Sequence, residues 1–352
     1  MHNNFKRDDQ MQVGLIGISG YGGTQLYQLL KHHPHIDNIH LYGHDLTKAK
    51  PVNQVIPGLI HESGTLVPYD ANQIMAENDV VFFATSAGVT TKLAKPFLEH
   101  DFPVIDLSGD FRLKSGAMFT KWYHKQAPAT AWLQQAHYGL ADFSSAEQSN
   151  YIANPGCYAT ATLLGLAPVV MHQWIDPTSI IVDAKSGTSG AGKQLSEMTH
   201  FSNTNENLQI YKVNQHQHIP EIMQQLQCWN SDISAIQFTT TLVPLTRGLM
   251  STIYVKVKTG ISEQQVEQSF EQTFADKADI HYCHQKLPMV KQVVGTNYCD
   301  VGMVFNPVTK IITIVSVIDN LIKGAGGQAI QNLNQRFGFS LNQGLSLEPI
   351  WP

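Results

Sequence analysis

The chain has 352 residues, of which 43% are apolar or aromatic and 14% are charged, and its formal net charge is −5. This composition is too apolar for a disordered regulator, and the length suits about two globular domains. Because no basic block is present, nucleic acid is not an expected partner.

In the first half, short apolar runs alternate with helical or loop segments. Residues 13–18 form such a run and lead into a glycine turn, after which Leu26, Leu29 and Leu30 recur at helical spacing. Further apolar runs follow at 39–42, 80–84 and 104–107. Strands that alternate with helices are typical of parallel βαβ units, so this half is predicted to be a doubly wound α/β domain.

The second half has a different pattern. A helix is predicted over 159–171, and β-branched or alternating runs at 180–184, 238–244, 253–258 and 311–317 predict strands. This half is predicted to be α+β with a mostly antiparallel sheet. After residue 323, glycines precede Ala329, Ile330 and Leu333 on one helical face, so a helix is expected to close the chain.

The cysteines and the N-terminus bear on the compartment. None of the four cysteines belongs to a C-x-x-C pair, which favours thiols in a reducing compartment over a zinc site. No apolar run approaches the roughly 20 residues that cross a bilayer, and residues 1–10 lack the apolar core of a signal peptide. We expect a cytoplasmic protein with no membrane partner and no bound metal, whose residues 1–10 are flexible.

The glycine turn after the first strand has the context of a dinucleotide loop, because it joins a strand to a helix. Glycines let the backbone approach a pyrophosphate, whose charge then meets the N–H groups at the helix start. No acidic residue stands directly at the end of the second strand to hold a ribose 2′-hydroxyl, which favours NADP, with Lys48 as a possible 2′-phosphate partner. The predicted cofactor-binding residues are Gly17, Ser19, Gly20, Tyr21, Gly22 and Gly23.

One cysteine, Cys157, stands in N-P-G-C just before a predicted helix, where Asn154 is expected to cap the helix. A helix N-terminus stabilises a thiolate, which is the nucleophilic form of cysteine. The residues alone leave a buried structural thiol as an equal alternative.

Two histidines, His216 and His218, precede a proline that can begin a helix. Imidazole suits proton transfer near neutral pH, and cysteine with histidine is the combination used in covalent acyl chemistry. The residues leave open which imidazole transfers the proton; we favour His218, beside the helix start, with His216 and Glu221 in support. Two loops, around Arg112 and Arg247, offer guanidinium groups for an anionic substrate.

The chain contains, in this order, the segments GISGYGG, DLSGDFRL, NPGCYATA, DAKSGTSGAGK, HQHIPEI, LVPLTRG, GTNYCDVG and DNLIKGAGGQAIQNLN. With these segments, the sequence resembles the N-acetyl-γ-glutamyl-phosphate reductase family of arginine biosynthesis over nearly the whole chain after residue 10.

The resemblance implies a Rossmann domain of residues 11–156 and 325–352, and a catalytic and oligomerisation domain of residues 157–324, like that of the aspartate-semialdehyde and glyceraldehyde-3-phosphate dehydrogenases. It implies NADPH as donor, N-acetyl-glutamyl phosphate as substrate and a homodimer or homotetramer. By motif, the nucleophile is Cys157 and the acid–base pair is His216 and His218, with Arg112, Glu221 and Arg247 binding substrate. It adds cofactor contacts at Ser186, Gly187 and Asn320.

Two alternatives stay open at this point. One is an acyl-phosphate reductase for a related substrate, either aspartyl phosphate or the lysine-pathway aminoadipyl analogue. The other is a non-enzymatic NADP-binding redox sensor with Cys157 as its sensing thiol.

Overall fold

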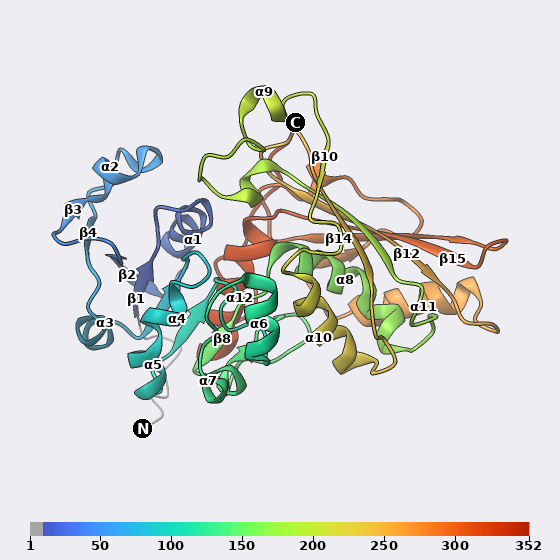
Figure 1. The fold of residues 1–352 in the computed structure, drawn as a ribbon, viewed down its shortest axis with the longest axis horizontal. Coiled ribbons are helices and arrows are strands. Elements are labelled where there is room, and N and C mark those ends of the chain that lie inside the picture. The colour runs from blue at the N-terminus through green and yellow to red at the C-terminus, as the bar shows by residue number, and fades with distance from the viewer. Residues whose placement is uncertain (1–9, 352) are drawn as a thin grey trace. The chain divides into compact units, whose positions relative to one another are not determined.

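A computed structural model describes residues 10–351, which divide into two compact units (Figure 1). Unit 1 contains residues 10–155 and 325–346, and unit 2 contains residues 156–324 and 347–351. The expectation of a flexible terminus concerns residues that, apart from Gln10, lie outside the described range.

Unit 1 is built on an eight-stranded sheet of order β3-β4-β2-β1-β5-β6-β8-β7. All pairings are parallel except that of β3 with β4. The strands are β1 (Met11–Ile16), β2 (Ile36–Gly43), β3 (Lys50–Pro51), β4 (Thr65–Pro68), β5 (Val80–Phe83), β6 (Val104–Asp106), β7 (His137–Tyr138) and β8 (Tyr151–Ala153). The helices are α1 (Tyr21–Lys31), α2 (Val52–Val55), α3 (Ala71–Glu77), α4 (Thr90–Leu93), α5 (Lys95–Glu99), α6 (Gly116–Tyr123), α7 (Thr130–Gln135) and α12 (Gly327–Phe337).

The central strands explain why this sheet is covered on both faces. All four residues of β5 are buried, and Val81 and Phe83 belong to a core with Ile16, Phe97 and other apolar side chains. Continuous apolar strands are typical of parallel sheets that carry helices on both faces. The predicted doubly wound architecture is therefore confirmed.

The last helix returns to unit 1, as expected. Its Ala329, Ile330 and Leu333 are fully buried, and α12 packs against α1. His33 Nε2 lies 2.8 Å from Asn334 Oδ1, and the Asn332 amide donates to Gly139 O at 2.9 Å. Buried polar groups that are paired in this way fix the helix in one register.

Unit 2 is built on a seven-stranded sheet of order β10-β11-β9-β12-β15-β14-β13, and Figure 1 shows α8, α10 and α11 on one side of it. The pairing is mostly antiparallel, as predicted, with β11–β9 and β13–β14 parallel. The strands are β9 (Ile181–Ser186), β10 (Gln209–Tyr211), β11 (Gln237–Leu242), β12 (Leu249–Lys256), β13 (Ile280–Tyr282), β14 (Cys299–Asn306) and β15 (Ile311–Ile318). The helices are α8 (Cys157–Met171), α9 (Phe201–Thr204), α10 (Ile219–Trp229) and α11 (Glu263–Phe274).

Three expectations are corrected. Helix α8 begins at Cys157 rather than at residue 159, and its N-cap is Gly156 rather than Asn154. The Asn154 amide donates instead to Ala325 O at 3.0 Å, so a tertiary contact takes the side chain expected to cap. Residues 347–351 belong to unit 2 rather than to the Rossmann domain, because the Ile350 N–H bonds Val294 O at 3.0 Å.

Candidate active site

Cys157 occupies the first position of α8, and its side chain is partly exposed. The helix behind it is almost entirely apolar, and residues 158–170 are all buried. No side-chain hydrogen bond from Gly156 caps the helix, and no acidic residue lies in its first turn. Burial thus anchors the helix, while its N-terminal dipole points toward the sulfur and favours a thiolate.

The two histidines lie together at the start of α10. His216 is 4% exposed, and its ring stands edge-on to that of His218, with centroids 4.7 Å apart. His216 Nδ1 accepts the backbone N–H of His218 at 3.2 Å, so that nitrogen carries no proton. Burial, with the nearby His218 and Lys212, lowers the pKa of His216 well below its usual value. His216 is therefore neutral at physiological pH.

An aromatic side chain connects the cysteine helix to the histidines. Tyr158, adjacent to Cys157, places its ring edge-on to His216 at 5.1 Å and to His218 at 6.1 Å. Its hydroxyl lies 3.0 Å from that of Tyr211 on β10. Burial, Tyr211 and Cys157 all raise the pKa of Tyr158, so this hydroxyl stays protonated. The structure thus brings the predicted cysteine and both predicted histidines around one buried tyrosine.

Glu221 lies in the first turn of α10 and is fully buried. Its Oε1 accepts the backbone N–H of Gly156 at 2.8 Å. The carboxylate therefore contacts the residue that immediately precedes Cys157, from a helix that begins more than sixty residues later in the chain.

Gly324 lies on the other side of the cysteine, in a π-helical turn over Ile322–Gly326. A Cβ added at this glycine would lie 2.7 Å from the Cβ of Cys157, closer than real side-chain carbons come. Only glycine lets this turn approach the nucleophile so closely. The sequence analysis assigned no role to Gly324, Tyr158 or Tyr211. Gly324 and Tyr158 nevertheless lie in two of the segments that carry the family resemblance.

The glycine loop of unit 1 has the shape that a pyrophosphate needs. Gly17 follows β1 with φ of +96°, and a Cβ at Gly23 would lie 2.2 Å from Gly17 O, so both positions require glycine. A Cβ at Gly22 would meet nothing within 4 Å, and one at Gly20 would meet only Gly17 O at 3.8 Å. The loop leaves space at the start of α1, whose first turn has no acidic side chain. These residues fit a dinucleotide phosphate, with Ser19 and Tyr21 in the same turn.

The other residues with a predicted cofactor role lie in unit 2. Ser186 ends β9, and the Gly187 N–H donates to Gly248 O at 2.9 Å. Asn320 accepts from Gly248 N at 2.7 Å and donates to Ser189 Oγ at 2.9 Å. The amide of Asn320 thus holds the loop after β9 against the loop that precedes β12.

Both predicted substrate-binding arginines make contacts within the chain. Arg112 is 7% exposed and donates from Nε to Asn154 O at 2.8 Å and from Nη2 to Leu107 O at 2.9 Å. Arg247 pairs with the buried carboxylate of Asp319 at 2.9 Å. Each guanidinium is therefore held in a defined direction, and its role toward substrate stays a prediction.

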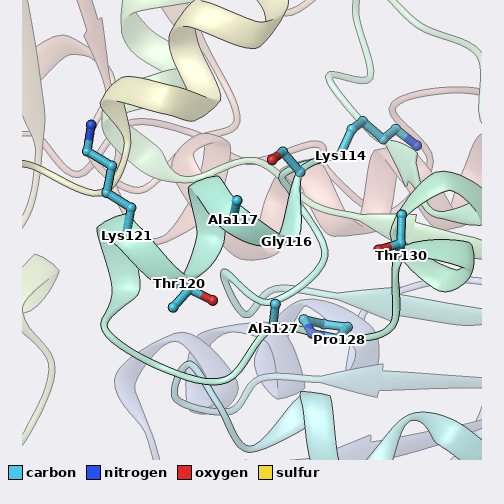
Figure 2. Close-up of a pocket in the computed structure, with 9 residues that line it drawn as sticks. Lys114, Gly116, Ala117, Thr120, Lys121, Ala127, Pro128 and Thr130 are labelled. Carbon is cyan, nitrogen blue, oxygen red and sulfur yellow. The ribbon is translucent and has the colours of Figure 1, made fainter.

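Figure 2 shows an open pocket of unit 1 at the start of α6, where the side chains of Lys114 and Lys121 extend away from one another. The Lys114 amine bonds the carbonyls of Leu133 and Gln134. Across residues 10–351, no group of three His, Cys, Asp or Glu side chains is placed to hold a metal ion. None of the described helices is long and apolar enough to span a membrane.

Comparison with known proteins agrees with this geometry. Residues 12–151 match the semialdehyde dehydrogenase NAD binding domain, and residues 157–320 match the semialdehyde dehydrogenase dimerisation domain. The N-acetyl-gamma-glutamyl-phosphate reductase of Limosilactobacillus fermentum is 57% identical over 342 residues, covering 97% of this chain and all of that protein. The chain belongs to the N-acetyl-gamma-glutamyl-phosphate reductase family.

Other relatives agree. The reductase of Listeria innocua is 50% identical over 345 residues, covering 97% of this chain and all of the relative. Among solved structures, aspartate semialdehyde dehydrogenase II from Vibrio cholerae matches with a TM-score of 0.68 at 20% identity, covering 93% of this chain and 98% of that chain. That likeness confirms the predicted two-domain α/β fold of the semialdehyde dehydrogenase type.

Proposed function

We propose that this member of the family reduces N-acetyl-L-glutamyl 5-phosphate to N-acetyl-L-glutamate 5-semialdehyde and phosphate, with NADPH as donor, in arginine biosynthesis. The observation that carries the proposal is the arrangement around Tyr158. It holds a cysteine at a helix N-terminus, a neutral buried imidazole and a second imidazole in one cluster. A thiolate with an acid–base partner is what covalent acyl transfer requires.

The chemistry follows from these side chains. Cys157 adds its sulfur to the acyl carbon, and the carbon–oxygen bond to phosphate breaks, which leaves a thioester on the enzyme. His218 takes the thiol proton and returns it to the departing phosphate. His216 stays neutral and holds the backbone of His218 through its Nδ1. The residues of the glycine loop would hold NADPH, which when bound would supply the hydride for reduction of the thioester carbonyl. The carbon–sulfur bond then breaks and Cys157 leaves as thiolate.

Two arginines are assigned to the substrate, and further residues to the cofactor. Arg247 is our choice for a substrate-binding side chain of unit 2, because its side chain is 24% exposed while Asp319 fixes its direction. Arg112 is the corresponding choice in unit 1. Ser186, Gly187 and Asn320 are retained as cofactor contacts, together with the residues of the glycine loop. All four cysteines are free thiols, which is typical of a reducing compartment, so we place the protein in the cytoplasm.

The test is oxidation of NADPH by the purified protein with each acyl phosphate in turn, followed by NADPH absorbance. N-acetyl-glutamyl phosphate should give the highest kcat/KM, above the aminoadipyl analogue and aspartyl phosphate. Cys157→Ser should bind NADPH but lose turnover, because a serine hydroxyl is far less ionised at neutral pH. Preference for another acyl phosphate would reassign the substrate, and no turnover with any of them would favour a redox sensor.

The open face of the unit 2 sheet supports a homodimer. Ile181, Tyr254, Thr313 and Val304 lie in direct cross-strand register on β9, β12, β15 and β14, and the three larger apolar side chains are 38–46% exposed. Such a row is self-complementary when two sheets pack face to face. Light scattering should report a dimer for the native chain and a smaller species for Tyr254→Arg. A larger native assembly would indicate a tetramer.

A further inference from the structure

The N-terminus of the cysteine helix is capped in an unusual way. The capping residue, Gly156, has no side chain, so it makes none of the hydrogen bonds that serine or aspartate would make at this position. Glu221 makes a different bond at this helix end: its Oε1 accepts the backbone N–H of Gly156 itself at 2.8 Å. In a capping box, a glutamate three positions into the same helix makes this contact. Here a glutamate from α10 makes it across two helices.

Burial of this carboxylate has a physical explanation. Glu221 is fully buried, yet it lies in the first turn of its own helix and beside the first turn of α8, which packs on α10. Both helix N-termini present partial positive charge to this carboxylate. The negative charge of Glu221 therefore stands at the same helix end that acts on the sulfur of Cys157.

We propose that Glu221 is a positioning residue for the nucleophile: its carboxylate caps α8 from the neighbouring helix, holds the backbone before Cys157, and offsets part of the helix charge that would otherwise stabilise the thiolate. This inference deepens the proposed function and rests on it, since it concerns the cysteine assigned as nucleophile. It replaces direct substrate binding as the role of Glu221.

A partial offset of the helix charge by Glu221 is useful in the proposed reaction. A thiolate formed too readily is a weaker nucleophile, because nucleophilicity falls as the thiol pKa falls. It is also more easily oxidised between turnovers. A carboxylate that restrains ionisation keeps the sulfur reactive and leaves its deprotonation to His218.

Other titratable groups lie on the elements near Cys157 and must be held constant in a test. These are Tyr158 on α8, Tyr211 on β10, His216 and His218 before α10, and Lys323 in the turn that contains Gly324. The tyrosines stay protonated near neutral pH, because burial raises the pKa of each. His216 stays neutral. The variants must therefore change only the carboxylate.

The experiment measures alkylation of Cys157 by iodoacetamide as a function of pH, without substrate or cofactor, with the modified peptide quantified by mass spectrometry. Glu221→Gln keeps an oxygen that can accept from Gly156 but removes the charge. We expect the midpoint of its pH profile to fall by about one unit, since loss of a nearby negative charge favours the thiolate. Glu221→Asp keeps the charge and should retain the parent midpoint. Glu263→Gln, in the first turn of α11, is the matched control and should leave the profile unchanged.

The readouts separate this inference from the proposed function. An unchanged alkylation midpoint in Glu221→Gln overturns the inference, and a rise confined to KM would then assign Glu221 to substrate. A lowered midpoint supports it even if the parent enzyme reduces none of the acyl phosphates tested, because alkylation needs no turnover. Thermal unfolding of each variant shows that the protein compared is folded.

Discussion

A methyl group added at residue 324 should disable the enzyme by moving its nucleophile. In Gly324→Ala the new Cβ would lie 2.7 Å from the Cβ of Cys157 and 3.1 Å from its Cα. Ordinary carbon contacts begin near 3.4 Å, so the two Cβ atoms must separate by about 0.7 Å. Neither side of the contact is a flexible side-chain end. The cysteine or the π-helical turn must therefore move.

The size of the effect follows from that displacement. Overpacking of this kind costs about 1–3 kcal/mol of unfolding free energy, and a shift approaching 1 Å at a reacting atom can cost roughly 100-fold in rate. We expect Gly324→Ala to lower kcat by about 10- to 100-fold at saturating acyl phosphate and to reduce the midpoint of thermal unfolding by a few degrees.

A glycine in open space provides the control for Gly324→Ala. Gly58→Ala introduces the same methyl group where no heavy atom lies within 4 Å, so its kcat and unfolding midpoint should match the parent. The reasoning fails if Gly324→Ala keeps turnover within twofold of the parent and alkylates Cys157 at the parent rate. In that case the close approach in the structure does not restrict the nucleophile.

Three further predictions concern protons and the cofactor. His218→Asn should lower turnover by about 10²- to 10⁴-fold and remove the limb of the pH–rate profile near neutrality. His216→Asn should keep that limb, because His216 is already neutral. Loss of the limb in His216→Asn alone would exchange the roles of the two histidines. Gly20→Val should weaken NADPH binding measured by calorimetry, since its side chain would enter the space left for the pyrophosphate, and unchanged affinity would reject the glycine-loop assignment. Burial and the neighbouring Asp110 raise the pKa of Asp106 from 3.8 to about 7, so the folded state binds this proton more tightly and stability should fall as pH rises between these values. Chemical denaturation should show a shallower fall across that window for Asp106→Asn, and an equal slope would contradict it.

The local sequence pattern was sufficient to predict many of the helices and strands and the family. The order of strand, glycine turn and helix at the start of unit 1 is confirmed, because strand period and glycine conformation are properties of neighbouring residues. The proline of His-Ile-Pro predicted the start of α10 for the same reason. The motifs that include Cys157, His216 and His218 indicated the family correctly.

Long-range packing decided what the local pattern could not. Asn154 is a good capping residue, but its amide bonds Ala325, some 170 residues later, and the cap of the cysteine helix is supplied by Glu221. Strand β14 was missed, because Gly302 and Asp300 interrupt its β-branched character, and its pairing with β15 and β13 defines it. The surroundings of the nucleophile come from segments distant in sequence. No local propensity encodes such contacts, since they form only when burial of the apolar helices and strands brings those segments together.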